Sequence, residues 1–184
     1  MNSKENEHAC SLRIDNPLGF HVRPVQRFAE LAQIFDSEIT VEIDGREADG
    51  KSVMGLMSLG GRCGSSMKIV TRGNDSRQAL EVIRYLVEED FFVEDDLDED
   101  GSSRRHIERL KKFASCFVSE INILMDGEEI ELKTPEDFDS LDFPPDKEVV
   151  ISASGEDERQ AGQVLEKLVK YRFYVEDAMD AASE

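Results

Sequence analysis

The sequence predicts an α+β fold that occurs twice along the chain, each time as an antiparallel sheet covered on one face by helices. Two observations predict it. Segments recur at a constant offset of 82 residues, and short alternating apolar runs are interleaved with amphipathic helical patterns. The chain has 184 residues, of which 39% are hydrophobic, so it can form the cores of two small domains.

The internal repeat needs no gaps. Phe35–Ile39 recurs as Phe117–Ile121, and Phe91–Asp95 recurs as Phe173–Asp177. A single constant offset indicates duplication of one domain. We therefore expect two domains of the same fold, covering residues 1–90 and 91–184.

For the first copy we expect strand 11–15, helix 22–34, strand 38–43, strand 46–50, short helix 53–59, strand 66–72 and helix 76–89. Pro24 marks the first helix start. The second strand alternates apolar and polar residues, and the last helix carries an apolar stripe: Ile39, Val41 and Ile43; Ala79, Ile83 and Leu86. Asp75 and its equivalent Asp157 are placed to cap the helices that follow them.

Composition excludes some classes of function. The net charge is −19, and acidic residues gather in the second half: residues 1–90 carry −4 and residues 91–184 carry −15. This balance argues against nucleic acid as a partner, because a phosphate backbone requires basic patches. No apolar run is long enough to span a bilayer, and the N-terminus lacks the apolar core of a signal peptide.

The three cysteines, Cys10, Cys63 and Cys116, are odd in number and lack metal-ligand spacing. They predict a reduced, cytoplasmic protein with no structural metal.

The stretch Gly19–Pro24 carries the clearest chemical signal. It places His21 directly before the expected helix start, with Arg23 two residues later. A helix N-terminus exposes unpaired N–H groups and favours anions. A neutral imidazole there can attack a phosphoryl group, so the pattern indicates a phosphohistidine site, although a lone histidine before a helix is more often a cap or a surface residue.

A second motif, Lys51–Gly60, follows about thirty residues later. Together with Leu18–Pro24 it resembles the HPr family, the histidine-containing phosphocarriers of the sugar phosphotransferase system, over about residues 10 to 90. The resemblance implies an open-faced β-sandwich of four strands and three helices. It also implies that His21 accepts the phosphoryl group, that Arg23 is its charge partner and that Ser52 is a regulatory serine.

The resemblance further implies partners. These are enzyme I as the donor, sugar-specific enzyme II components as acceptors, and an HPr kinase if Ser52 is phosphorylated. Ser52 has a simpler interpretation as the cap of its short helix. For partner docking we select a set near the histidine: Phe20, Arg27, Val53, Met54 and Met57. Val53, Met54 and Met57 either form a flexible apolar surface patch or pack in the core.

The second copy keeps the core pattern but not the chemistry. Ser103 stands at the position equivalent to His21, and Thr134 at the position equivalent to Ser52. A serine cannot form the labile phosphoramidate of a phosphocarrier. His106 is displaced by three residues from the acceptor position, so a capping or surface role suits it better. We expect a degenerate domain that binds a partner or the first copy.

The sequence thus predicts a phosphocarrier rather than a stand-alone enzyme, with His21 as a covalent intermediate and with no metal or small cofactor. The alternative is a regulatory HPr-like protein whose phosphorylation at His21 or Ser52 signals metabolic state. The histidine chemistry is the same in both.

Overall fold

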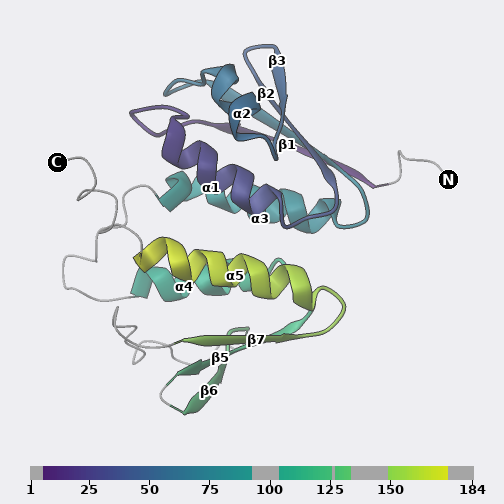
Figure 1. Ribbon diagram of the computed structural model, residues 1–184, viewed down its shortest axis with the longest axis vertical. Coiled ribbons are helices and arrows are strands. Elements are labelled where there is room, and N and C mark those ends of the chain that lie inside the picture. Colours follow the sequence, from purple (N-terminus) through teal and green to yellow (C-terminus); the bar gives the residue numbers. More distant parts are fainter. Residues whose placement is uncertain (1–5, 93–103, 126, 134–148, 174–184) are drawn as a thin grey trace. The chain divides into compact units, whose positions relative to one another are not determined.

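The computed structural model describes residues 6–92, 104–125, 127–133 and 149–173 (Figure 1). The chain divides into two compact units, Met1–Glu94 and Asp95–Glu184. The first unit therefore extends slightly past the expected boundary at residue 90.

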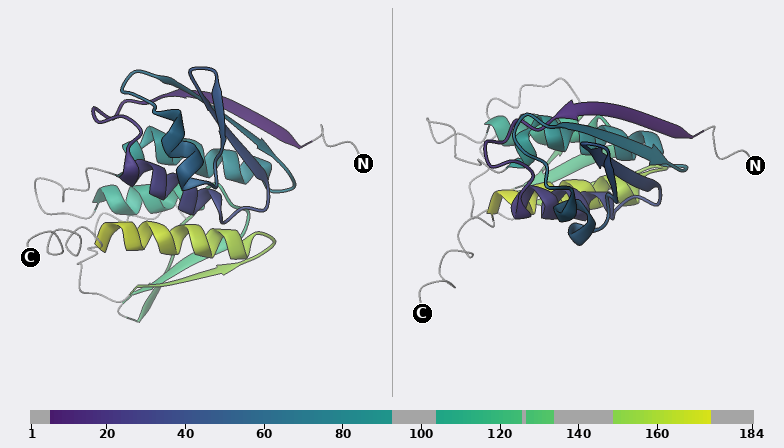
Figure 2. Two further views of the ribbon diagram at one scale, coloured as in Figure 1. Left: turned by 45° about the horizontal axis from the view of Figure 1, so that its top comes forward. Right: turned by 90° about the horizontal axis from the view of Figure 1, so that it is seen from above.

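The first unit contains seven regular elements and a final 3-10 turn. In chain order these are β1 (Glu7–Arg13), α1 (Val22–Ala32), β2 (Glu38–Ile43), β3 (Arg46–Asp49), α2 (Val53–Leu59), β4 (Ser66–Arg72), α3 (Ser76–Glu88) and η1 (Asp90–Phe92). The strands form an antiparallel sheet in the order β1-β4-β2-β3. Helices α1 and α3 lie along one face of this sheet (Figures 1 and 2). This α+β architecture is the one predicted.

The core of the first unit lies between the sheet and the helices. Val41 of β2 is opposite Ile69 of β4, and both side chains are buried, while their neighbours along each strand are more exposed. Phe28 and Leu31 of α1 and Ile83 and Leu86 of α3 are also fully buried. The apolar side chains that repeat every two residues in the strands and every 3.6 residues in the helices thus pack together in one layer.

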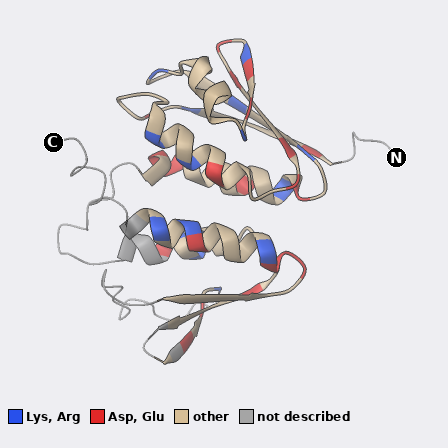
Figure 3. Ribbon diagram, viewed as in Figure 1, with Lys and Arg blue, Asp and Glu red and all other residues tan. Residues whose placement is uncertain are grey.

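In the second unit the described elements are α4 (Arg104–Ala114), β5 (Glu120–Met125), β6 (Glu128–Glu131), β7 (Val150–Ser154) and α5 (Glu158–Phe173). The three described strands form an antiparallel sheet in the order β6-β5-β7. Helix α4 and strands β5 and β6 have the same bounds as α1, β2 and β3 plus 82 residues. Charges of both signs are interspersed along α5 (Figure 3).

Two parts of the expected second domain lie outside the described residues. They are the segment 94–96, which is equivalent to residues 12–14 of the first strand, and the segment after Thr134, which is equivalent to the short helix 53–59. Phe91 and Phe92 belong to the turn η1, and both are buried.

The aspartates expected to act as caps, Asp75 and Asp157, both bind a distant loop. Asp75 occupies the N-cap position of α3, but its side chain makes no capping hydrogen bond there. Its carboxylate accepts hydrogen bonds from the backbone N–H groups of Asp36 (2.8 Å) and Ser37 (2.9 Å) and from the Ser37 hydroxyl. Asp75 therefore ties a distant loop to the start of α3. The same arrangement recurs in the second unit.

There, Asp157 accepts hydrogen bonds from the N–H groups of Val118 (2.8 Å) and Ser119 (2.9 Å) and from the Ser119 hydroxyl (2.6 Å). Desolvation by partial burial alone would raise the pKa of Asp157. The hydrogen bonds from Ser119 and Val118 stabilise the carboxylate and lower the pKa below its usual range.

Candidate functional site

The site begins with a tightly held loop between β1 and α1. Asn16 is buried, and its side-chain oxygen accepts a hydrogen bond from the Leu18 N–H at 2.9 Å, while its backbone oxygen accepts one from Gly19 at 2.8 Å. Gly19 has φ of +71°, and a Cβ on it would lie 2.6 Å from the oxygen of Gly61. Only glycine fits here. The Phe20 N–H donates to the same Gly61 oxygen at 2.9 Å.

His21 is the N-cap residue of α1, with extended backbone (φ −90°, ψ −173°) and no side-chain capping bond. The imidazole is half-buried, so His21 is neither a side-chain cap nor a fully exposed surface residue. Its Nε2 is buried and has no hydrogen-bond partner among the described residues. Nδ1 is therefore the ring nitrogen left accessible to a reactant.

The first turn of α1 provides donors for an anion. The Val25 N–H already donates to the His21 oxygen at 3.0 Å, and Pro24 has no N–H. Among the described residues, the N–H groups of Val22 and Arg23 have no acceptor. The Arg23 side chain is exposed and makes no ion pair with the described part of the chain. These groups suit an anion on Nδ1.

Phe20, selected for docking, is instead part of the core. It is 3% exposed. Its ring lies edge-on to Phe28 with centroids 5.8 Å apart and tilted against Phe91 at 5.5 Å. An aromatic side chain next to a reactive histidine cannot be assigned to core or surface from sequence, because one of its partners is 71 residues away.

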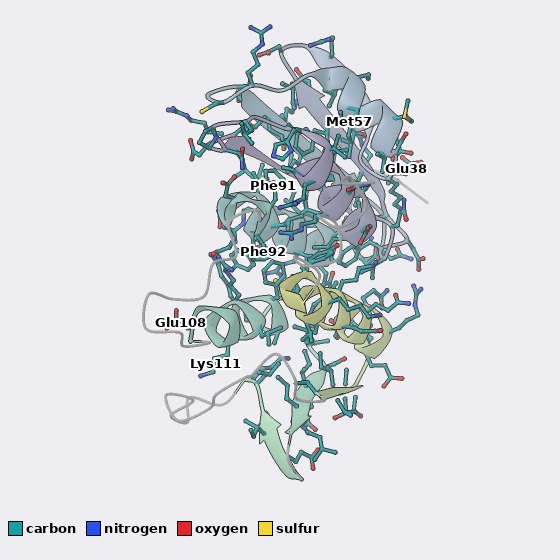
Figure 4. The ribbon with its side chains drawn as sticks, turned by 60° about the vertical axis from the view of Figure 1, so that its left-hand side comes forward. Glu38, Met57, Phe91, Phe92, Glu108 and Lys111 are labelled. Atoms are coloured by element: carbon teal, nitrogen blue, oxygen red, sulfur yellow. The ribbon has the colours of Figure 1, made fainter. Side chains whose placement is uncertain are left out.

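Arg27, also selected for docking, is buried as well, with 8% of its surface exposed. Its Nη1 donates a hydrogen bond to the Phe91 carbonyl at 2.6 Å and another to the Phe92 carbonyl. Buried guanidinium groups require such acceptors. Figure 4 labels the two phenylalanines of this turn. Arg27 therefore holds the end of the first unit rather than a partner.

Ser52 is the N-cap residue of α2. Its hydroxyl accepts a hydrogen bond from the Gly55 N–H at 3.1 Å, so the capping interpretation is correct. The side chain is half-buried and is not enclosed in the core. Capping does not exclude phosphorylation, since a helix N-terminus also favours a phosphate.

The methionines of α2 lie on the surface. Met54 is 81% exposed, Met57 is exposed as well, and Val53 is half-buried, whereas Leu56 and Leu59 are buried in the core. The surface alternative for the apolar set is therefore the correct one for the two methionines. A flexible apolar surface of this kind suits a protein partner.

Two exposed apolar residues beside His21 were not selected from the sequence. Leu18 is 76% exposed and Val22 is 52% exposed. The available signal was Leu18 in a Pro-Leu-Gly turn, where an apolar side chain has no strand or helix to bury it.

Other kinds of site are not found in the described residues. They contain no cluster of histidine, cysteine, aspartate or glutamate that could hold a metal ion. None of their helices is long and apolar enough to cross a bilayer.

The sequence of the first unit is similar to that of known proteins. Residues 9–89 match the model of a family described as the PTS HPr component phosphorylation site. The HPr-like protein Crh of Halalkalibacterium halodurans is 40% identical over 72 residues, which cover 39% of this chain and 86% of the relative. The phosphocarrier protein HPr of Treponema pallidum is 35% identical over 81 residues, which cover 44% of this chain and 92% of the relative.

A crystal structure of HPr from Thermoanaerobacter tengcongensis is also similar, with 36% sequence identity and a TM-score of 0.46. The match covers 47% of this chain and 98% of that one.

Proposed function

Because this chain belongs to the HPr family, we propose that it is a phosphocarrier that accepts a phosphoryl group from enzyme I on His21 and passes it to sugar-specific enzyme II components. One observation carries the proposal. His21 buries Nε2 and leaves Nδ1 accessible at a helix start where the N–H groups of Val22 and Arg23 have no acceptor among the described residues.

The transfer follows from these groups. The Nδ1 lone pair attacks the phosphorus of a phosphohistidine on enzyme I. The new N–P bond forms as the donor's P–N bond breaks, and the departing imidazole keeps the electron pair. Nδ1 must be unprotonated to attack, so the reactive tautomer carries its proton on Nε2, the nitrogen that faces the interior.

Charge stabilisation comes from the chain itself. The N–H groups of Val22 and Arg23 and the Arg23 guanidinium donate hydrogen bonds to the phosphoryl oxygens. The proposal includes no metal and no small cofactor. Transfer onward is the reverse step with a new acceptor, so the protein is a covalent intermediate rather than an enzyme. Its proposed place is the cytoplasm, where phosphoenolpyruvate is available.

Docking in this proposal uses the exposed apolar side chains around the histidine. Leu18 and Val22 flank it, and Met54 and Met57 are exposed on α2. Phe20 and Arg27 are removed from the docking set because they are buried.

A second candidate function is regulation, and the position of Ser52 favours it. Ser52 begins the helix that carries Met54, so a phosphate there would lie beside the proposed docking surface and hinder partner binding. An HPr kinase is the partner that this alternative requires.

We also propose that the second unit is a degenerate HPr-like domain with a binding role. Its described elements repeat those of the first unit at an offset of 82 residues. The sequence places Ser103 where the acceptor histidine would be, and this residue lies outside the described part of the chain.

The decisive experiment incubates the protein with enzyme I and phosphoenolpyruvate, then measures intact mass at neutral and at acidic pH. We expect one phosphate that is stable at neutral pH and lost in acid, and none on His21→Ala. His8→Ala is the matched control, because His8 is half-buried in β1 with its Nδ1 3.1 Å from the Ser76 hydroxyl. Acid-labile phosphate on His21→Ala would contradict the assignment.

A further inference from the structure

We infer that Arg27 is a positioning residue for His21 and acts through the turn Asp90–Phe92. The inference deepens the proposed function and rests on it for the meaning of the site. It starts from the backbone of this turn. Asp90, Phe91 and Phe92 all lie in the left-handed region, with φ of 49°, 57° and 55°. Three consecutive non-glycine residues in this region persist only where surrounding contacts hold them.

Arg27 provides such contacts. It lies in the middle of α1 and is buried. One of its guanidinium nitrogens donates hydrogen bonds to the carbonyl oxygens of both Phe91 and Phe92. A buried guanidinium is costly unless it is hydrogen-bonded, and the carbonyls of a left-handed turn cannot continue a helical ladder. The arginine and the turn thus stabilise each other. An apolar side chain at position 27 could fill the same volume but could not bind these carbonyls.

The turn in turn supports both ends of the loop that leads to His21. At one end, the Asp90 carboxylate accepts a hydrogen bond from the Asn16 side-chain amide at 3.1 Å, and Asn16 fixes Leu18 and Gly19. At the other end, the Phe91 ring packs against Phe20, the residue before His21, with centroids 5.5 Å apart. The angle at which Nδ1 faces a reactant therefore depends on a turn about 70 residues away in sequence.

This position makes the effect on His21 indirect. The Arg27 guanidinium binds the carbonyls of Phe91 and Phe92, and not the imidazole or the N–H groups of Val22 and Arg23. Loss of its hydrogen bonds would loosen the turn, then the loop 16–20, and then the ring. Because a small misplacement of reacting groups is enough to slow a transfer, the rate should respond more than the fold does.

The test uses the full chain with Arg27→Met, which keeps length and apolar volume, and Arg27→Lys, which keeps a charged donor. Three quantities are measured: thermal unfolding, the ring-nitrogen NMR signals of His21 as a function of pH, and the rate of phosphoryl uptake from enzyme I. We expect Arg27→Met to unfold cooperatively, to shift the His21 nitrogen signals and to lower the uptake rate about tenfold. Arg27→Lys should recover part of both.

The matched control is Arg84→Met. Arg84 is another arginine of the first unit, ion-paired with Glu81 and Glu88 on α3. It should leave the His21 signals and the rate unchanged. If Arg27→Met does not fold, Phe91→Leu replaces it, because this variant keeps the backbone carbonyls that Arg27 binds and removes the ring that packs against Phe20. Its His21 signals should shift as well.

Unchanged His21 signals and rate in a folded Arg27→Met or Phe91→Leu would overturn the inference. So would equal changes in Arg84→Met. Failure of the proposed function gives a different result: the wild-type protein would take no phosphate from enzyme I, while the NMR signals would still report whether Arg27 positions the ring.

Discussion

At the scale of single residues, the proposed chemistry depends on the orientation of His21. Burial of Nε2 directs the ring so that only Nδ1 is open, and Gly19 is required because no side chain fits against the Gly61 carbonyl. The orientation of the imidazole thus depends on contacts made by neighbouring residues, such as Gly19.

Arg23→Ala should slow phosphoryl transfer because it removes a charge-assisted contact to the phosphoryl oxygens. The cost should be at most about 1.5–3 kcal/mol in the transfer barrier. The measurement is the rate of acid-labile phosphate formation. Arg77→Ala is a close control, because Arg77 is an exposed arginine at the second position of α3, as Arg23 is in α1. Equal rates for both variants would leave Arg23 without a role in transfer.

Ser52→Asp should reduce transfer to His21 while the protein stays folded. Aspartate still caps α2, but its charge would be desolvated against the apolar surface that carries Met54 when a partner binds. Ser52→Asn is the neutral capping control and should transfer at the wild-type rate. If the asparagine variant is as slow as the aspartate variant, charge is not the cause.

At the scale of elements, local patterns predicted the first unit well. All seven regular elements lie within a few residues of their expected bounds, because alternation, Pro24 and Ser52 are local signals. The turn Asp90–Phe92 could not be predicted. Its left-handed backbone is held by Arg27, more than sixty residues earlier, and no local pattern encodes such a contact. Burial of Phe20 and Arg27 was missed for the same reason.

The turn Asp90–Phe92 contributes to the stability of the first unit. A fragment of residues 1–94 should be more stable to denaturant than a fragment of residues 1–90 by at least about 3 kcal/mol. The shorter fragment loses two buried phenylalanines and leaves Arg27 without the carbonyls that it binds. Chemical unfolding of the two fragments measures the difference. Equal midpoints would show that the turn contributes nothing to the core.

The bond between Asp157 and Ser119 makes the second unit sensitive to acid. The pKa of Asp157 is lowered in the folded state, so its stabilising effect is complete above the usual pKa of 3.8 and is lost as pH falls through the lower folded value. Wild type should therefore be more stable than Asp157→Asn at neutral pH, and the difference should shrink below about pH 4. Unfolding curves across this range test it; a difference independent of pH would contradict it.

At the scale of the whole molecule, two similar folds carry different surfaces. The first half has a net charge of −4 and the second half −15, and the repeat aligns His21 of the first half with Ser103 of the second. Core patterns can be repeated without the chemistry, because the core depends on the apolar spacing of strands and helices and the site depends on a few loop residues.

A fragment of residues 95–184 should unfold cooperatively and take up no acid-labile phosphate from enzyme I. Its described core is apolar and continuous, with Phe113, Ile121 and Leu165 buried. Thermal unfolding by circular dichroism and intact mass at neutral pH are the measurements. A random-coil spectrum, or phosphate on His106, would contradict the expectation.

The turn Asp90–Phe92 also has a consequence for the order in which the protein is made. The first core is complete only when Phe91 and Phe92 have left the ribosome, since both are buried in it. Residues of the second unit are still to be added at that point, at about 5–20 residues per second. During that interval the nascent chain already carries a finished first unit. Under the proposed function, His21 is then able to take up a phosphoryl group before the second unit is complete.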